Sequence, residues 1–338
     1  MATTTIAPGR AMPQERAARS LWRDAWRRLI SSSVGRIGLG MTLALILMAI
    51  IVPIARPYNP ARDRNLRAKL LAPSPLLQDD VKQRQKITTW AYPFGTDELG
   101  RNLFIRVLHG APISLTVGFF AVSLAVVLGS LLGLVAGFVG GWFDTVSTWA
   151  MDIMLAFPSI LLAIAITSVS NSPDSLSTRF ANAVLTLPGV ATIMDQQLFN
   201  AMLAVSIVEI PVFGRIARST VIALRGQEYV TAARSIGSPG RRILFRHILP
   251  NSMSPLLVQA TLSIATAITS VAALGFLGLG ARPPRPEWGT MLANSRGFIG
   301  QGKWWYAAFP GIAIIFTVLG FNLLGDGLRD ALDPRTRK

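Results

Sequence analysis

The sequence contains no cysteine and only two histidines, His109 and His247. The absence of cysteine excludes disulfide bonds and metal sites built from thiolates. Two histidines so far apart in the sequence do not indicate a metal site either. We therefore predict that this chain binds no metal ion.

Charged residues are scarce as well. They make up 15% of the 338 residues, whereas soluble domains usually contain about 25%. Hydrophobic residues make up 51%, and this composition predicts a membrane protein. The pattern Gly-x-x-x-x-Gly-Lys-Ser/Thr is absent, so the chain lacks the loop that cradles the phosphates of ATP. We expect no cofactor in the chain itself.

The charge that is present is mostly positive, with a formal net charge of +16. Such a charge is compatible with nucleic-acid binding. Here, however, the arginines alternate with apolar segments and form no continuous basic face. Attachment to the anionic inner surface of a membrane explains this pattern more simply. We predict membrane lipid, and not nucleic acid, as the partner of the basic segments.

Residues 1–36 contain seven arginines and no recognisable cleavable signal. Within them, apolar residues at helical spacing are interleaved with arginines, which predicts a cytoplasmic amphipathic helix on a membrane surface. The apolar residues are Leu21, Trp22, Ala25, Trp26 and Leu29. A disordered basic tail is the interpretation for residues 1–15 and an alternative for the rest.

Six apolar stretches are long enough to cross a bilayer, which takes about 20 residues. They predict an all-α membrane protein, a polytopic bundle of six transmembrane helices. The predicted spans are 37–55, 112–140, 143–169, 197–218, 254–280 and 305–325. Residues 56–109 then form an external loop, 110–325 a five-helix core, and 326–338 a cytoplasmic tail. Six spans place both termini and the loop 219–250 on one side, which we predict to be the cytoplasm.

Two features within these spans predict local geometry. Gly129, Gly133 and Gly137 recur every four residues, and small residues at this spacing let two helices approach closely in lipid. We expect their helix to end near Gly140. Pro158 predicts a kink in the third span.

The loop 219–250 contains a polar segment, residues 227–250, that we call the arm. Gly237 lies where a helix would need a left-handed stop. Ser238 is a suitable N-cap and Pro239 suits the first turn of a second helix, which Pro250 would end. The pattern predicts a cytoplasmic helix–turn–helix outside the bilayer.

The arm resembles the EAA loop of ABC-importer permeases, in which Glu-Ala-Ala is followed by three residues, a glycine and later Ile-x-Leu-Pro. The matching residues are Ala232, Ala233, Gly237, Leu249 and Pro250. Thr231 and His247 stand where the motif has Glu and Ile. Glu228, one turn earlier, offers a carboxylate nearby.

Three further segments extend the resemblance over roughly residues 35–338. They are 94–101, 276–291 and 322–334, and they look like the C-type inner-membrane subunit of dipeptide/oligopeptide ABC importers. Two departures are Asn102, where the family commonly has Asp, and a longer external loop at 170–196.

This resemblance implies a permease subunit, not an enzyme, of an ATP-driven, binding-protein-dependent importer of peptides or similar small solutes in the bacterial inner membrane. Nickel chelates, opines or glutathione are alternative solutes. The implied partners are a second homologous permease subunit, an extracytoplasmic solute-binding protein, and two cytoplasmic ATPase subunits or domains that hold ATP and Mg.

The resemblance also implies that the arm couples the ATPases to alternating access. The implied coupling residues are Glu228, Thr231, Ala232, Ala233, Gly237, Leu249 and Pro250. In this interpretation Ala232 and Ala233 form the small-residue face of a short helix that fits into a cleft of an ATPase subunit, and Gly237 fixes the bend after that helix. The arm then moves as a rigid body and turns the fourth and fifth spans.

Glu209 and Pro211 lie inside the fourth span and are the candidates for the translocation path. An acid at membrane depth costs roughly 2.5–3.5 kcal/mol on insertion scales. Glu209 is predicted to line the path and attract an ammonium group of the solute. The alternatives are an ion pair with Arg215 or Arg218 or a position close to the water interface. Pro211 is better interpreted as shaping the helix.

Outside the spans, we expect Asp97, Glu98 and Arg101 to shape the external loop, with docking of the binding protein as an alternative. Tryptophans are typical of the membrane interface, which is the interpretation for Trp288, Trp304 and Trp305.

Two other functions remain open from the sequence. A secondary transporter would need several buried ionisable groups or paired broken helices, and Glu209 is nearly alone. A membrane-anchored interaction protein would need neither the arm nor the glycine strip.

Overall fold

The computed structural model describes residues 21–79, 82, 88, 90–172, 177–179, 182, 186 and 194–332, except for the side chains of Leu21 and Trp22. The prediction of an all-α protein is confirmed, because these residues form helices and turns with two isolated β-bridges and no strand. The external loop predicted at 170–196 and the ends of the chain lie largely outside the described residues.

Most of the helices follow one another along the chain with short connections, but residues 56–102 separate α2 from α4 and residues 171–195 separate α6 from α9. They are α1 (Leu21–Ser31), α2 (Ser33–Ala55), α4 (Leu103–Val139), α5 (Gly141–Ala156), α6 (Ser159–Ser170), α9 (Gln196–Arg225), α10 (Glu228–Ser235), α11 (Gly240–Ile243), α12 (Leu249–Phe276), α13 (Trp288–Ser295) and α14 (Trp305–Leu332). Short 3₁₀ turns cover Leu66–Ala68, Ser74–Leu76 and Arg296–Gln301, and a π-turn covers Leu244–Ile248.

Five of the described helices are long and apolar enough to cross a membrane, and a sixth span results if α5 and α6 count as one. These two helices are bent by 98° at the break between them. The predicted kink at Pro158 is therefore a sharp corner. Phe157 is extended there and Pro158 precedes the first residue of α6, because a proline disfavours helical backbone in the residue before it.

The helix α4 begins at Leu103, nine residues before the predicted start at 112. The side chain of Asn102 caps it by accepting the N–H of Phe104 at 3.0 Å. Its first turns contain Arg106 and His109, which the sequence suggested were outside the span. Both are buried; His109 contacts the carbonyls of residues 105 and 56 at 2.8 and 2.7 Å.

The glycine strip of α4 packs closely against another helix, as predicted, and that helix is α9. A Cβ added at Gly129 would lie 2.5 Å from the carbonyl oxygen of Ile210, and one at Gly133 would lie 2.0 Å from that of Gly214. Any side chain at these positions would force the two helices apart. This contact fixes α9, and with it the start of the arm, against α4.

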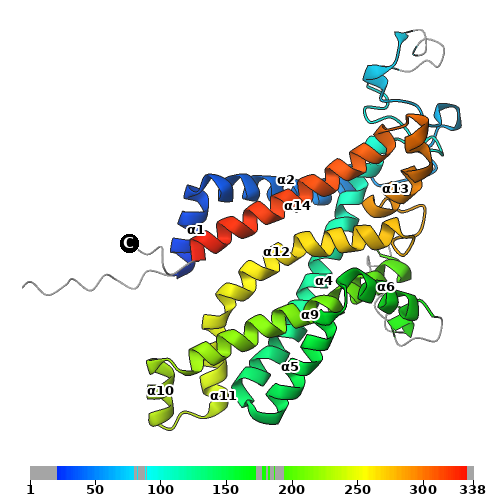
Figure 1. Cartoon of the computed structure of the whole chain (residues 1–338). Coiled ribbons are helices and arrows are strands. Elements are labelled where there is room, and N and C mark those ends of the chain that lie inside the picture. The colour runs from blue at the N-terminus through cyan, green and yellow to red at the C-terminus, as the bar shows by residue number, and fades with distance from the viewer. Residues whose placement is uncertain are drawn as a thin grey trace, which may run out of the picture.

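The bundle has two distinct ends (Figure 1). Figure 1 shows α1, the C-terminal end of α14, and α10 with α11 at one end, which we call the arm end. The helix α13 and the segment between α2 and α4 lie at the other, the loop end. At the arm end, Ala25 and Leu29 of α1 pack against Ala331 of α14, whereas Trp26 is exposed.

Candidate functional site

The helix α10 ends in a left-handed turn at Gly237, as predicted. Gly237 has a φ of +80°, its N–H donates to the carbonyl of Arg234 at 3.0 Å, and the N–H of Ser238 donates to that of Ala233 at 3.0 Å. These bonds form a Schellman motif, which favours glycine at this position. A Cβ added here would contact nothing within 4 Å, so only the backbone requires the glycine.

The second half of the arm differs from the prediction. Ser238 does not cap α11; Pro239 precedes its first residue, and no side chain caps it. The helix passes through the π-turn into α12, and 240–276 forms one long helix. Pro250 lies in the first turn of α12 and ends nothing, because a residue without an N–H suits that position. The arm is one separate helix, α10, followed by an extension of α12.

The two alanines of the motif lie on different faces of α10. Val230 and Ala233 are buried against Ile243 and Ile248 in the chain's own core. Ala232 is exposed. The expectation that both alanines face outward is therefore wrong for Ala233, since residues three apart share a face of a helix and residue 233 follows buried residue 230.

The outward surface of the arm includes large apolar side chains that the sequence reasoning missed. Ile236 is 84% exposed, and Tyr229 and Phe245 are also exposed. Glu228 and Thr231 are exposed beside them, whereas Leu249 is half-buried against the core. The sequence did contain a sign of this surface, namely the apolar residues within an otherwise polar segment.

The arm is fastened to the end of α4. Nη1 of Arg225 donates to the carbonyl of Gly137 at 2.8 Å, and its guanidinium lies 5.9 Å from the centre of the Phe138 ring. A Cβ added at Gly240 would lie 3.3 Å from the same ring. Arg225 just before the arm and Gly240 in the middle of the arm therefore both lie against the C-terminal end of α4.

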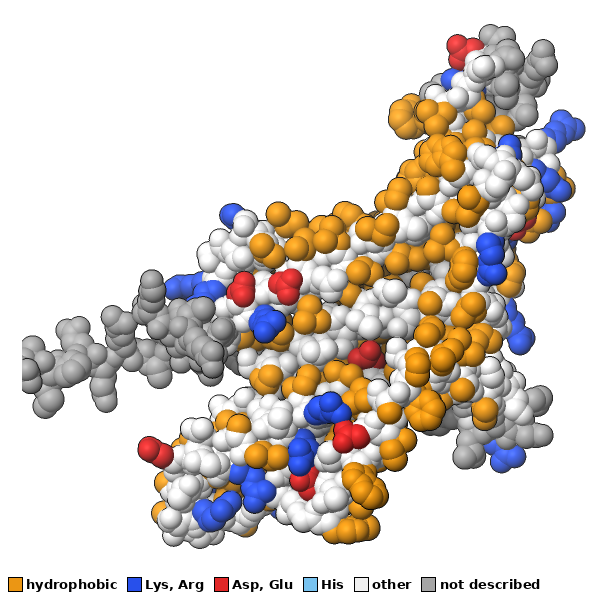
Figure 2. Space-filling model, viewed as in Figure 1, with side chains coloured by type: hydrophobic (Ala, Val, Ile, Leu, Met, Phe, Trp, Pro, Cys, Tyr) orange, Lys and Arg blue, Asp and Glu red, His pale blue; other side chains and the backbone are white. Residues whose placement is uncertain are grey.

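Glu209 is not paired with the arginines that the sequence offered. Arg215 contacts Asp152 at 2.5 Å, and Arg218 forms a two-point ion pair with Asp144. Figure 2 shows the resulting mixture of basic and acidic side chains over α5 and α9 near the arm end. Glu209 instead accepts a hydrogen bond from the Oγ of Ser263 on α12 at 3.1 Å. Glu209 is thus free of those ion pairs.

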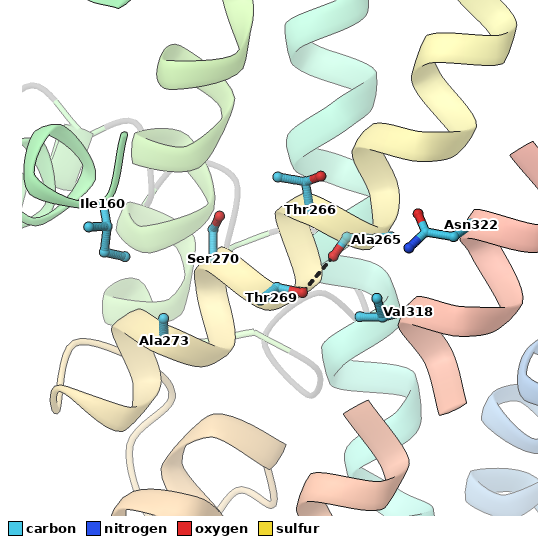
Figure 3. A pocket seen from close by; sticks show the side chains of 8 residues that line it. All are labelled: Ile160, Ala265, Thr266, Thr269, Ser270, Ala273, Val318 and Asn322. Atoms are coloured by element: carbon cyan, nitrogen blue, oxygen red, sulfur yellow. Dashed lines mark hydrogen bonds between the residues drawn. The ribbon is translucent and has the colours of Figure 1, made fainter. Parts of the chain in front are cut away.

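An open hollow of about 380 Å³ with a mostly apolar lining lies between α6, α12 and α14 (Figure 3). Its lining residues are Ile160, Ala265, Thr266, Thr269, Ser270, Ala273, Val318 and Asn322. Figure 3 shows Asn322 on α14 facing α12, and Oγ1 of Thr269 donating to the carbonyl of Ala265 at 2.9 Å. Among the residues that the structure describes, no charged side chain lines the hollow. Neither Glu209 nor Pro211 lines it, and Pro211 is buried within an unbroken α9.

Comparison with known proteins identifies the family. Residues 129–338 match the model of the "binding-protein-dependent transport system inner membrane component" family, and residues 20–73 match the "N-terminal TM domain of oligopeptide transport permease C". The chain belongs to this family of inner-membrane transport components. It is therefore a permease, a transport subunit and not an enzyme.

The relatives of the permease align over nearly the whole chain. It is 43% identical to the dipeptide transport system permease protein DppC of Alkalihalophilus pseudofirmus, over 98% of this chain and 96% of that protein. It is 39% identical to the di/tripeptide transport system permease protein DppC of Pseudomonas aeruginosa, over 93% and 92%. It is 37% identical to the glutathione transport system permease protein GsiD of Pectobacterium atrosepticum, over 96% and 94%.

Membership in a binding-protein-dependent ABC transport system implies a solute-binding protein and an ATPase as partners of this permease. Among its described residues, no cluster of three or more histidine, cysteine, aspartate or glutamate side chains could hold a metal ion.

At the loop end, the permease buries a network of charged side chains. It includes Asp97, Glu98 and Arg101, which we expected to shape the external loop. Asp97 is fully buried and lies 2.6 Å from the Nε of Arg101 and 3.5 Å from that of Arg106. Glu98 accepts a hydrogen bond from the hydroxyl of Tyr306, and burial raises the pKa of Glu98 above its ordinary value.

The tryptophans of the loop end are mostly structural. Trp288 and Trp305 are buried, so the prediction that they are interface anchors is wrong; Trp304 is half exposed. Nε1 of Trp288 donates to the carbonyl of Val107 at 2.9 Å, which joins α13 to α4. Glu287, also buried, caps α13 by accepting the N–H groups of Gly289 and Thr290 at 2.6 and 2.8 Å. These contacts fix the position of α13 at the loop end.

Proposed function

We propose that this permease is the C-type subunit of an ATP-driven importer of dipeptides and tripeptides. The observation that carries the proposal is the near-complete alignment with dipeptide and di/tripeptide permeases. The exposed apolar arm of the structure adds support, because an apolar surface on an otherwise polar segment requires a partner. Glutathione, itself a small peptide derivative, is the alternative solute that a relative's name supports.

In this proposal the arm docks into a cleft of an ATPase subunit through Tyr229, Ala232, Ile236 and Phe245. Complete burial of an isoleucine stabilises a contact by about 1.5–3 kcal/mol, and Ile236 is the most exposed large apolar side chain of the structure, at 84%. Glu228 and Thr231 flank this surface. Gly237 and Ala233 act indirectly, since they hold α10 in position.

Motion of the arm would be passed to two spans. The arm follows α9 directly and continues into α12 through the π-turn. Lipid cannot satisfy loose backbone groups, so whole helices would shift together. The hollow between α6, α12 and α14 would then open toward one side and close toward the other, which is alternating access.

The hollow is also our candidate for this subunit's part of the translocation path. Thr266, Thr269 and Asn322 are exposed along spanning helices, and polar side chains at membrane depth usually face a water-filled cavity or another protein chain. A second permease subunit would complete the wall. Glu209 borders the same side of α12 through Ser263.

For the orientation, we propose that the arm end and both termini are cytoplasmic. The basic α1 and the ATPase-binding arm share that end. The loop end would then face outward toward the solute-binding protein. Lipid would cover the middle of α2 and α14, where Figure 2 shows a broad apolar surface without charged side chains.

The docking surface is tested in the complete importer by Ile236→Ser. Because this side chain contacts little of its own chain, the variant should fold normally and yet bind the ATPase at least tenfold more weakly, with a matching loss of ATP-driven uptake. Ile54→Ser is the matched control, since Ile54 is 77% exposed at the opposite end. Unchanged ATPase association in the Ile236 variant would refute the assigned surface.

The solute class is tested by competition. The purified importer with its own binding protein is reconstituted in vesicles, and uptake of a labelled dipeptide is challenged with dipeptides, tripeptides, glutathione, opines and nickel chelates. We expect the short peptides to compete. If only glutathione or a non-peptide solute competes, the peptide assignment fails while the family assignment remains.

A further inference from the structure

The carboxylate of Glu209 has unused hydrogen-bonding capacity. Glu209 lies halfway along α9, is half-buried, and accepts one hydrogen bond, from the Oγ of Ser263. An ionised carboxylate has two oxygens and about four acceptor positions. No basic side chain among the described residues lies within ion-pair distance of it, because Arg215 and Arg218 of the same helix contact other acids.

A charged group within a spanning segment costs several kcal/mol unless it pairs or contacts water. Arg215 and Arg218 lie six and nine residues further along α9, so they do not share the face of Glu209. They pair with Asp152 and Asp144 on α5, which leaves the carboxylate of Glu209 to interact with water or with a cation from outside the chain.

A row of uncharged polar side chains leads from Glu209 to the hollow. Gln259, Ser263, Thr266 and Ser270 follow one another on α12 at spacings of three or four residues, which places them on one face. Nε2 of Gln259 donates to the Oγ of Ser263 at 3.2 Å, and the last two of the four line the hollow of Figure 3.

The length of this row suits a short peptide. Ser263 is itself buried against Glu209, so it marks the position of the carboxylate and does not face the hollow. It lies seven residues from Ser270, which corresponds to about 10 Å along a helix. An extended chain advances 3.3–3.6 Å per residue, so two to three peptide residues fit along the row. Hydroxyl and amide groups can both donate and accept, so they can hydrogen-bond to either the N–H or the C=O groups of a peptide main chain of any sequence.

We propose that Glu209 binds the ammonium group at the amino end of the transported peptide, while the polar face of α12 and Asn322 hold its main chain. This inference rests on the proposed function and adds a chemical requirement to it: the permease itself, and not only the solute-binding protein, selects a free amine. Glu209 is then a residue that determines specificity.

The test measures binding without the solute-binding protein, which could select amines by itself. The complex of both permease subunits and the ATPases is placed in lipid nanodiscs. Binding of a labelled dipeptide and of its N-acetylated form is compared for the wild type, Glu209→Gln and Asp152→Asn. Asp152 is the matched control, since it is a carboxylate of the same bundle that already has a partner.

We expect the wild type and Asp152→Asn to bind the free-amine dipeptide about tenfold or more tightly than the acetylated form. Glu209→Gln should bind both forms as weakly as the wild type binds the acetylated one. Equal binding of the two forms by the wild type would overturn the proposal, and so would an equal loss for both forms in Glu209→Gln.

A second variant covers the case in which Glu209→Gln does not assemble. Glu209→Asp retains the charge and should retain the preference for the free amine, with reduced affinity; loss of preference there would count against the proposal. Peptide uptake by the wild-type importer tests the proposed function separately, because uptake without amine selection by the permease would refute only this inference.

Discussion

The two ends of the permease differ in how far their charged and apolar side chains are buried. At the loop end, Asp97 and Arg101 are buried and paired, and Trp288 is enclosed by three helices. At the arm end, Ile236 and Phe245 are exposed, and the ion pair of Arg215 with Asp152 is open to the surroundings, since both side chains are more than half exposed.

This difference separates a region that is complete within one chain from one that needs other molecules. The polar groups of the loop end pair with one another within the chain, so their contacts contribute to the folding stability of the permease. The arm end leaves its apolar surface uncovered, so its contacts contribute to assembly. We therefore expect substitutions at the loop end to change stability, and substitutions at the arm to change association and coupling.

The largest effect is expected for Asp97→Asn. This change leaves Arg101 and Arg106 buried beside a neutral side chain, and removing one member of a buried ion pair typically costs about 3–5 kcal/mol. Asp152→Asn breaks an exposed pair, which is worth about 0–1 kcal/mol. Thermal unfolding of both variants in the same detergent provides the measurement. Similar small losses for both would remove the distinction between the two ends.

A smaller, pH-dependent effect is expected for Glu287→Gln. Burial raises the pKa of Glu287 to about 7, despite the backbone N–H groups of Gly289 and Thr290 that lower it. Because the folded state holds this proton more tightly than the unfolded state, the contribution to stability is complete below about pH 4.5 and is lost as the pH rises through about 7. The full change is on the order of 3 kcal/mol.

Glutamine cannot ionise, so stability of the Glu287→Gln variant should depend less on pH across this window than that of the wild type. Glutamine also has only one acceptor oxygen for the two N–H groups, so the variant should not exceed the wild type at low pH. Unfolding temperatures measured from pH 4.5 to 8 check both statements. Parallel curves for the two proteins would show that Glu287 does not titrate in this range.

A still smaller change in stability than that of Glu287→Gln is expected for Gly237→Ala. Its left-handed backbone costs about 1–2 kcal/mol with a side chain, although there is space for the Cβ. Only α10 should reorient, so the unfolding temperature should hardly move while ATP-driven uptake falls. Gly226→Ala is the matched control, since Gly226 has a φ of −86° and lies directly before the arm, at the end of α9. Equal uptake by the two variants would argue against coupling through the geometry of α10.

The sequence was most informative where local chemistry decides the structure. The left-handed turn at Gly237 and the close helix packing at Gly129 and Gly133 depend on the absence of a side chain, and both could be predicted, although the partner helix α9 could not. The start of α4 could not be predicted, because the sequence analysis placed charged residues outside the spans. Arg106 lies inside the helix because it pairs with buried Asp97, and only the tertiary structure brings Asp97 to that position.

The candidate site was only partly predictable for a related reason. The motif located the arm, but which alanine of α10 faces outward depends on the helix that α10 packs against. The hollow combines side chains from α6, α12 and α14, which are remote in sequence. The polar spacing from Ser263 to Ser270 was visible in advance, although nothing in one sequence showed which side of α12 it faced.

The π-turn at Leu244–Ile248 has a consequence for how the chain tolerates changes in length. A π-turn holds one residue more than an α-turn, so a one-residue deletion within it can be absorbed by tightening to an ordinary turn. A deletion just beyond it, between residues 251 and 258, would rotate everything that follows by about 100°. Natural insertions and deletions should therefore be tolerated in this turn and excluded from the helix after it.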